Sequence, residues 1–308
     1  MVSIQVPGPG EEFVDLANHA LLRKNILITG GSSGIGRATV KKLLKAGANV
    51  FCFTRSEQKF NDLATYRKSK GTVRAIRCDL ERPADLKQAF NSLMRDLDGK
   101  LHGIINCAGI AQSKDYRDTL LDEWDRIFTV NARAPMHLIS MAVPYLRNRK
   151  HSAIVNVSDT PVPKPKQTIT CVAKACLDSL TQCSALELAP FNIRVNGVAP
   201  GCTETDLRLN QRDLTLSAED EARFLSRAAE ATVLKRVNKP SDVANTIVWL
   251  VSKESSFVNG EIITVDSGAS VLTAAADLQW HAPEALEEPA QQERPSALSQ
   301  GLKRLLNL

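Results

Sequence analysis

A glycine-rich stretch near the start of the chain has the composition of a phosphate-binding turn. The apolar residues 26–28 precede it, and Gly30, Gly34 and Gly36 follow. Glycine lets the backbone approach a ligand closely, and the N-terminus of a helix offers unpaired N–H groups to an anion. A strand, a glycine turn and a helix in this order predict a site for the pyrophosphate of a dinucleotide. The spacing is a relative of the general G-x-G-x-x-G fingerprint, with three residues between the first two glycines.

A second group of candidate binding residues follows the next apolar run, residues 49–54. An NAD enzyme places a carboxylate here, where it binds the ribose 2′-hydroxyl. The chain instead has Arg55 followed by Ser56. A guanidinium binds a 2′-phosphate in a fork, whereas a carboxylate would repel it. We therefore predict NADP(H) as the cofactor; the alternative for Arg55 is a solvated surface cation.

Strands and helices alternate along the chain, and they must position these residues. Strands are expected at 25–29, 49–54, 73–79, 101–106, 153–157, 193–198 and 261–265. Helices are expected at 37–46, 57–69, 83–97, 170–188 and 241–251, with a long one from about 121 past Asn131. Most of the strands are β-branched and continuously apolar, which is typical of a parallel sheet covered on both faces. The sequence predicts an α/β fold, a single Rossmann-fold domain with a doubly wound parallel sheet.

The expected domain covers residues 24–270 and lies between two extensions. Residues 1–23 are expected to form an N-terminal arm. Residues 271–308 are polar and rich in proline, and we expect a flexible C-terminal extension with a short amphipathic end.

Composition excludes several classes of function. The 308 residues are 43% hydrophobic, with a net charge of +5 and no basic block, so nothing favours nucleic acid. Seven cysteines, scattered without CxxC pairs, suggest reduced thiols and show no metal-ligand spacing. The sequence has no secretory signal and no apolar run of membrane length, which predicts a cytoplasmic protein without a membrane partner.

Several ordered motifs together resemble the classical short-chain dehydrogenase/reductase family. They are Thr29–Gly36, Asn106-Cys107-Ala108-Gly109, Asn131, Lys174, Pro200-Gly201 and Val265–Gly268. The resemblance implies one Rossmann domain with a seven-stranded sheet, a small-molecule substrate, and a homodimer or homotetramer. It also implies a set of cofactor-binding residues, which with the two at the end of the second strand are Gly30, Ser32, Ser33, Gly34, Ile35, Gly36, Arg55, Ser56, Asp79, Asn106, Ala108, Gly109, Lys174, Thr203 and Thr205.

The catalytic residues depart from the family pattern, which uses Asn, Ser, Tyr and Lys. Asn131 and Lys174 match it, but Thr170 stands four residues before Lys174, where the family has Tyr. A threonine hydroxyl does not ionise usefully near neutral pH and is a poor replacement acid. The place of the serine holds Asp159, although a shifted alignment would put Ser158 there.

A substrate that needs no acid explains this departure. An iminium ion is already cationic, so hydride delivery gives a neutral amine, and Asp159 would stabilise the cation. Arg133 is a further candidate, either as the partner of Asp159 or as a ligand of a substrate carbonyl. The pattern is similar to that of fungal indole-alkaloid reductases in secondary metabolism, some of which also guide a Diels–Alder cyclisation. The alternatives are an NADP(H)-binding pseudoenzyme and a carbonyl reductase with a relocated proton donor such as Ser158.

Overall fold

The computed structural model describes residues 21–64, 70–147, 149–205 and 217–274. Seven parallel strands form one sheet in the order β3-β2-β1-β4-β5-β6-β7. The strands are β1 (Asn25–Thr29), β2 (Asn49–Thr54), β3 (Thr72–Arg77), β4 (Gly103–Asn106), β5 (Ser152–Val157), β6 (Ile193–Pro200) and β7 (Ile262–Val265). The predicted single α/β Rossmann domain with a doubly wound sheet is confirmed.

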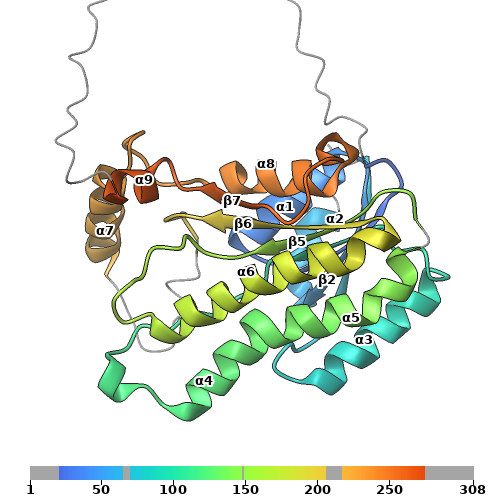
Figure 1. The fold of residues 1–308 in the computed structure, drawn as a ribbon, viewed down its shortest axis with the longest axis horizontal. Coiled ribbons are helices and arrows are strands. Elements are labelled where there is room, and N and C mark those ends of the chain that lie inside the picture. Colours follow the sequence, from blue (N-terminus) through green and yellow to red (C-terminus); the bar gives the residue numbers. More distant parts are fainter. Residues whose placement is uncertain (1–20, 65–69, 148, 206–216, 275–308) are drawn as a thin grey trace, which may run out of the picture. The chain divides into compact units, whose positions relative to one another are not determined.

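Helices cover both faces of the sheet (Figure 1). Helices α1 and α8 pack on one face, and α3, α5 and α6 pack on the other. The helices are α1 (Gly34–Lys45), α2 (Asn61–Ala64), α3 (Pro83–Asp96), α4 (Leu121–Phe128), α5 (Ala134–Leu146), α6 (Thr168–Leu188), α7 (Ala218–Glu230), α8 (Pro240–Val251) and α9 (Ala269–Ala274). The 3₁₀ turns are Glu57–Phe60, Tyr116–Asp118, Ala189–Phe191 and Lys253–Ser255, and a π-helical turn, Thr129–Arg133, joins α4 to α5.

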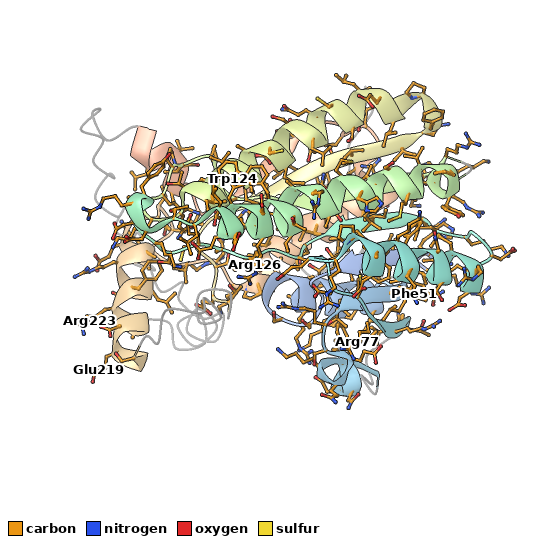
Figure 2. The ribbon with its side chains drawn as sticks, turned by 90° about the horizontal axis from the view of Figure 1, so that it is seen from below. Phe51, Arg77, Trp124, Arg126, Glu219 and Arg223 are labelled. Carbon is orange, nitrogen blue, oxygen red and sulfur yellow. The ribbon has the colours of Figure 1, made fainter. Side chains whose placement is uncertain are left out.

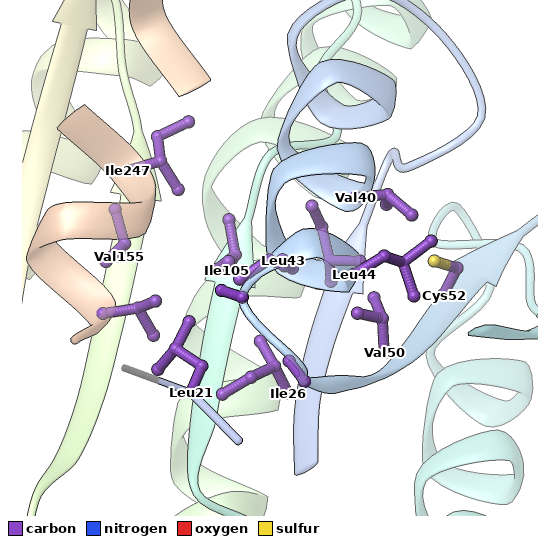
Figure 3. Packing of buried hydrophobic residues seen from close by; sticks show 14 of the residues in the cluster. Leu21, Ile26, Val40, Leu43, Leu44, Val50, Cys52, Ile105, Val155 and Ile247 are labelled. Carbon is purple, nitrogen blue, oxygen red and sulfur yellow. The ribbon is translucent and has the colours of Figure 1, made fainter. Parts of the chain in front are cut away.

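The central strands are buried on both sides, which explains their continuous apolar sequences. Figure 3 shows the core between the sheet and the α1/α8 layer, where Leu43 and Leu44 of α1 meet Ile26 of β1 and Ile105 of β4. This core fixes the start of α1 against the end of β1. The glycine turn between them is therefore held on both sides.

Two predicted helices differ from the observed ones. The segment expected as one helix from residue 57 begins with a 3₁₀ turn and continues as α2 to Ala64. Its remainder, residues 65–69, lies outside the described residues, as do most of the N-terminal arm and of the C-terminal extension. The expected long helix is broken by the π-helical turn, which contains Asn131 and Arg133. Such turns often occur where a side chain must be re-aimed at a functional site.

The chain runs outward from β1 through β2 to β3 and then crosses back to β4 on the other side of β1, so the strand order reverses between β1 and β4. Ligands of open α/β sheets bind at the carboxyl ends of the strands next to such a switch point. The register places Thr29 at the end of β1 beside Asn106 at the end of β4, and Asn106 beside Asn156 of β5. The predicted binding segments therefore lie at one edge of the sheet.

Candidate active site

The glycine turn packs against the segment that follows β4. Gly30 has a φ of +72°, and a Cβ on it would lie 2.7 Å from the backbone of Ala108. A Cβ on Gly36 would lie 2.1 Å from the carbonyl oxygen of Gly30. The backbone N–H of Ala108 donates to Oγ1 of Thr29 at 3.2 Å, which ties the two segments together. Both glycines are thus required by close backbone contacts.

The N-terminus of α1 is open to an anion. Ser33 is its N-cap residue, but its side chain makes no capping hydrogen bond, and no acidic residue stands in the first turn. Helix N-terminal N–H groups without such partners favour a bound phosphate. Thr205 lies over this turn, because a Cβ on Gly34 would lie 2.9 Å from its Cγ2. The residues around the turn, which include the predicted Ser32 and Ile35, fit a dinucleotide pyrophosphate.

Two other predicted binding residues take part in local hydrogen bonds. Oγ1 of Thr203 donates to the carbonyl oxygen of Gly201 at 2.9 Å, in the loop that leads to Thr205. Nδ2 of Asn106 donates to Oδ1 of Asn156 at 2.8 Å, and Oδ1 of Asn106 is buried without a partner in the described part of the chain.

Arg55 lies at the carboxyl end of β2 and points to solvent. Its side chain is 64% exposed, and its Nη1 lies 3.8 Å from Oε1 of Glu81. The N–H of Ser56 donates to Oγ1 of Thr54 at 3.1 Å, and this turn directs Arg55 outward. Asp79 follows β3 on the neighbouring strand, and its Oδ1 accepts the N–H of Glu81 at 3.1 Å. Arg55, Ser56 and Asp79 therefore lie after the carboxyl ends of two neighbouring strands, β2 and β3, where we predict the adenosine.

Glu81 is the residue that the sequence reasoning missed at this edge. Its Oε1 also accepts from Nε of Arg126 at 3.0 Å. Arg126 belongs to α4 and is labelled in Figure 2. Because β3 pairs with β2, an acid shortly after β3 comes close to Arg55. An acid is thus present near Arg55, although none stands at the end of β2 itself.

Asn131 and Lys174 face the same glycine, Gly109. A Cβ on Gly109 would lie 3.5 Å from Oδ1 of Asn131 and 3.5 Å from Nζ of Lys174. Both ends of the Asn131 amide bind Ile110, since Oδ1 accepts its N–H at 2.9 Å and Nδ2 donates to its carbonyl oxygen at 2.8 Å. Nζ of Lys174 donates to the carbonyl oxygen of Val157 at 2.6 Å. The two predicted catalytic residues therefore lie together beside the Asn106–Gly109 segment.

The charge of Lys174 is strongly influenced by its surroundings. Burial lowers the pKa of Lys174, while the negative charge of Asp159 opposes this shift. Burial also raises the pKa of Cys107 to about 12, so its thiol stays protonated beside Lys174. The pKa of Asp178, one turn after Lys174 on α6, is raised by burial and lowered in part by a hydrogen bond from Ser158.

Thr170 and Ser158 use their hydroxyls within the protein. Thr170 is 4% exposed, and its Oγ1 accepts the N–H of Gln112 at 2.8 Å. The side chain of Gln112 in turn accepts the N–H of Ile169 at 3.0 Å, so it anchors the first turn of α6. Ser158 is also 4% exposed, and its Oγ donates to the carbonyl oxygen of Lys174 at 3.4 Å. Ser158 thus faces α6.

Asp159 presents its carboxylate at the end of β5 and pairs with Lys164. Oδ1 of Asp159 lies 2.5 Å from Nζ of Lys164 and accepts the N–H of Thr160 at 2.8 Å. The side chain of Asp159 is 21% exposed. In this structure Asp159 pairs with Lys164 and Arg133 is exposed, so the suggested pairing of Asp159 with Arg133 stays a prediction. No signal in the sequence beyond the lysines of the Pro161–Lys166 loop pointed to Lys164.

Neither a membrane-spanning helix nor a metal-binding cluster occurs among the described residues. No helix in the described ranges is both long and apolar enough to cross a membrane. Among the same residues, no cluster of three or more His, Cys, Asp and Glu side chains is arranged to hold a metal ion.

The sequence and fold are similar to those of known proteins over most of the chain. The family model described as enoyl-(acyl carrier protein) reductase matches residues 30–270. A cyclopentanol dehydrogenase of Comamonas sp. (strain NCIMB 9872) is 32% identical over 80% of this chain and 96% of its own length. The 3-oxoacyl-[acyl-carrier-protein] reductase FabG of Thermotoga maritima is 33% identical over 80% and 97%, respectively. The L-xylulose reductase of Caenorhabditis elegans is 32% identical over 82% and 98%.

Solved structures agree with these relatives. A short-chain type dehydrogenase/reductase from Mycobacterium marinum has a TM-score of 0.72 and 26% identity, over 82% of this chain and 98% of that one. The ligand-free aldohexose dehydrogenase of Thermoplasma acidophilum, at 24% identity and a TM-score of 0.71 over 87% and 98%, shows the same fold. The chain therefore belongs to the short-chain dehydrogenase/reductase family, oxidoreductases that use nicotinamide cofactors.

Proposed function

We propose that this protein is an NADP(H)-dependent reductase that transfers hydride to the carbon of an iminium ion. The observation that carries the proposal is the exchange of groups at the end of β5. Asp159 offers a carboxylate there, while the hydroxyls of Ser158 and Thr170 are buried and engaged with α6 and Gln112. A ketone needs a proton donor at this place, whereas an iminium ion needs a stabilising negative charge.

The residues divide the work as follows. Gly30, Gly34 and Gly36 with the N-terminus of α1 would hold the pyrophosphate, and Arg55 would bind the 2′-phosphate. Bound NADPH supplies the hydride. The iminium carbon forms the new C–H bond, and the π electron pair of the C=N bond moves to nitrogen, which leaves a neutral amine. Asp159 stabilises the cation before transfer and needs to donate no proton.

Hydrogen bonds hold the predicted catalytic residues Lys174 and Asn131 in place. Lys174 donates to the carbonyl oxygen of Val157, and Asn131 is engaged by Ile110, so both are held in place beside Gly109. We assign to Lys174 the binding of the nicotinamide ribose and to Asn131 the support of this segment. Arg133 is exposed, and its role toward a substrate carbonyl stays a prediction.

The wider setting rests on the resemblance to fungal indole-alkaloid reductases. It extends the proposal to a cytoplasmic enzyme of alkaloid biosynthesis that acts as a homodimer or homotetramer. Control of a Diels–Alder cyclisation after reduction belongs to the same proposal. Light scattering coupled to gel filtration tests the oligomeric state independently of activity.

Stopped-flow oxidation of NADPH with a cyclic imine and a matched cyclic ketone tests the chemistry. We expect turnover of the imine, and a loss of roughly ten- to a hundredfold in kcat/KM for Asp159→Asn, because a hydrogen bond to a charged group contributes about 1.5–3 kcal/mol. Asp115→Asn is the matched control. Asp115 also pairs with a lysine of the Pro161–Lys166 loop, Lys166, and its side chain is 55% exposed. Turnover of the ketone alone would favour a relocated proton donor. Tight NADPH binding without turnover of either compound would favour a pseudoenzyme.

A further inference from the structure

The carboxylate that the proposed function assigns to a cationic substrate already has a cation beside it. Nζ of Lys164 lies 2.5 Å from Oδ1 of Asp159. The two side chains are 34% and 21% exposed, so the pair lies at the border between the site and solvent. An ammonium at this distance occupies the position in which an iminium nitrogen would be stabilised best.

The backbone holds Lys164 in this position. Pro163 and Pro165 flank it, and each proline ring fixes its own φ near −65°. The carbonyl oxygen of Lys164 accepts the N–H of Gln167 at 3.2 Å, directly before α6. The carbonyl oxygen of Lys166 accepts the N–H of Lys114 at 3.0 Å, which ties the end of the loop to a distant segment. The ammonium is therefore presented to Asp159 by an anchored loop.

The negative charge of Asp159 is already balanced by a neighbouring lysine in the free protein. The negative charge of Asp159 raises the pKa of Lys174, and the positive charge of Lys164 lowers it. Asp159 is thus already paired with one ammonium group, that of Lys164. A cationic substrate gains the full attraction of Asp159 only when this group moves away. Lys164, which is partly exposed and bonded through a flexible four-carbon stem, is the group that can move.

From these contacts we infer that Lys164 is an internal competitor for the substrate cation and a determinant of specificity. The inference rests on the proposed function. In the free enzyme, Lys164 neutralises Asp159; a cationic substrate replaces it and releases its ammonium to solvent. Replacing Lys164 by an uncharged side chain must then improve the binding of cations, the opposite of what the loss of a substrate-binding lysine would do.

Lys164→Met tests the inference, with Lys166→Met as the matched control. Lys166 stands two residues later on the same loop but pairs with Asp115 at 3.5 Å, so its loss changes the loop charge without freeing Asp159. The dissociation constant of pyrrolidinium, a saturated cyclic amine, is measured by calorimetry on the NADP⁺ complex. For a partly exposed ion pair we expect about a two- to fivefold tighter Kd in Lys164→Met. We expect a similar fall in KM for a cyclic imine.

The following results decide the inference. If Lys164→Met binds the amine more weakly than wild type, or no differently from Lys166→Met, the inference is overturned. In the Asp159→Asn background the Lys164→Met change should have no effect, because nothing remains to compete for. Thermal unfolding checks that each variant is folded, and Lys164→Gln repeats the measurement with a polar side chain.

Failure of the proposed function gives a different pattern. If the wild type turns over no imine while Lys164→Met still tightens amine binding, the competitor role stands and the reduction does not. If imine is reduced but Lys164→Met behaves as Lys166→Met does, the reduction stands and the competitor role is refuted.

Discussion

Replacing Arg55 by alanine should weaken the binding of NADPH and leave that of NADH nearly unchanged. Arg55 is the cation at the end of β2, and its guanidinium would meet only the 2′-phosphate, which NADH lacks. Ser56 beside it offers a hydroxyl to either cofactor. The predicted effect is therefore a change in the ratio of the two dissociation constants.

The size of the effect follows from the exposure of Arg55. A hydrogen bond to a charged group contributes about 1.5–3 kcal/mol. With a side chain that is 64% exposed, solvent screening favours the lower end of this range. About 1.5 kcal/mol corresponds to a roughly tenfold weaker Kd for NADPH. The effect should shrink as salt is added, because screening acts strongly on exposed charges.

Glu81 provides a test in the opposite direction. Its carboxylate lies 3.8 Å from Arg55 and competes with a phosphate for the guanidinium. An exposed ion pair of this kind is worth about 0.2–1 kcal/mol, so Glu81→Gln should tighten NADPH binding by up to about fivefold. Arg74→Ala is the matched control for Arg55→Ala. Arg74 lies on β3 away from its carboxyl end and pairs with Asp96 at 2.8 Å.

The assay is a titration of each variant with NADPH and with NADH, followed by the fluorescence of the bound nicotinamide. Equal losses for both cofactors in Arg55→Ala would refute the reasoning, since the 2′-phosphate would then have no part in the effect. A loss in Arg74→Ala as large as in Arg55→Ala would show that net charge, and not a specific contact, attracts the cofactor.

Further predictions concern two glycines of the site and His102, which lies at the other end of β4. Gly36→Ala should lower the melting temperature and abolish NADPH binding, because its Cβ would lie 2.1 Å from a backbone oxygen; Gly109→Ala, with its nearest atoms at 3.5 Å, should fold normally and weaken NADPH binding alone. Burial lowers the pKa of His102 from 6.5 to about 4, so stability should be lost as the pH falls from 6.5 to 4, by about 1–2 kcal/mol after a discount for exposure. Urea unfolding at several pH values measures this slope, and an unchanged slope in His102→Gln would contradict the assignment.

The sheet was predictable because its signals are local. Strands β1 and β2 have the predicted bounds, since their apolar runs end at a glycine turn and at Arg55. The helix expected from residue 57 was less predictable, because its first turn is 3₁₀ and the described part of α2 is only four residues long. The π-helical turn at Asn131 has no counterpart in the hydrophobic pattern, which continues through it.

Contacts between side chains were predictable only where strand order determines them. The approach of Glu81 to Arg55 follows from the pairing of β2 with β3, and could have been found from the expected strand order. The Asp159–Lys164 pair depends on the path of a proline-rich loop, which neither periodicity nor composition specifies. Arg133 is exposed at the end of a π-helical turn, which the sequence pattern did not predict.

The contacts of the potential proton donors bear most directly on the chemistry. Oγ of Ser158 donates to the backbone of α6, and Oγ1 of Thr170 is buried against Gln112. Burial raises the pKa of the Cys107 thiol to about 12, far from a useful donor at neutral pH. Of the groups gathered beside Gly109 and β5 in the described structure, these three would therefore protonate a ketone oxygen poorly.

The two lysine side chains complete the argument. Lys174 donates to the carbonyl oxygen of Val157, and Lys164 is paired with Asp159, so a ketone oxyanion would have to take either lysine from an existing partner. An iminium ion makes the opposite demand, because it replaces Lys164 at a carboxylate that is already in place. Hydride transfer leaves the amine uncharged until it takes up a proton from solvent. In that interval the product's hold on Asp159 is weaker, and Lys164 can return. The same ion pair that disfavours ketone reduction would thus help release the amine after each turnover.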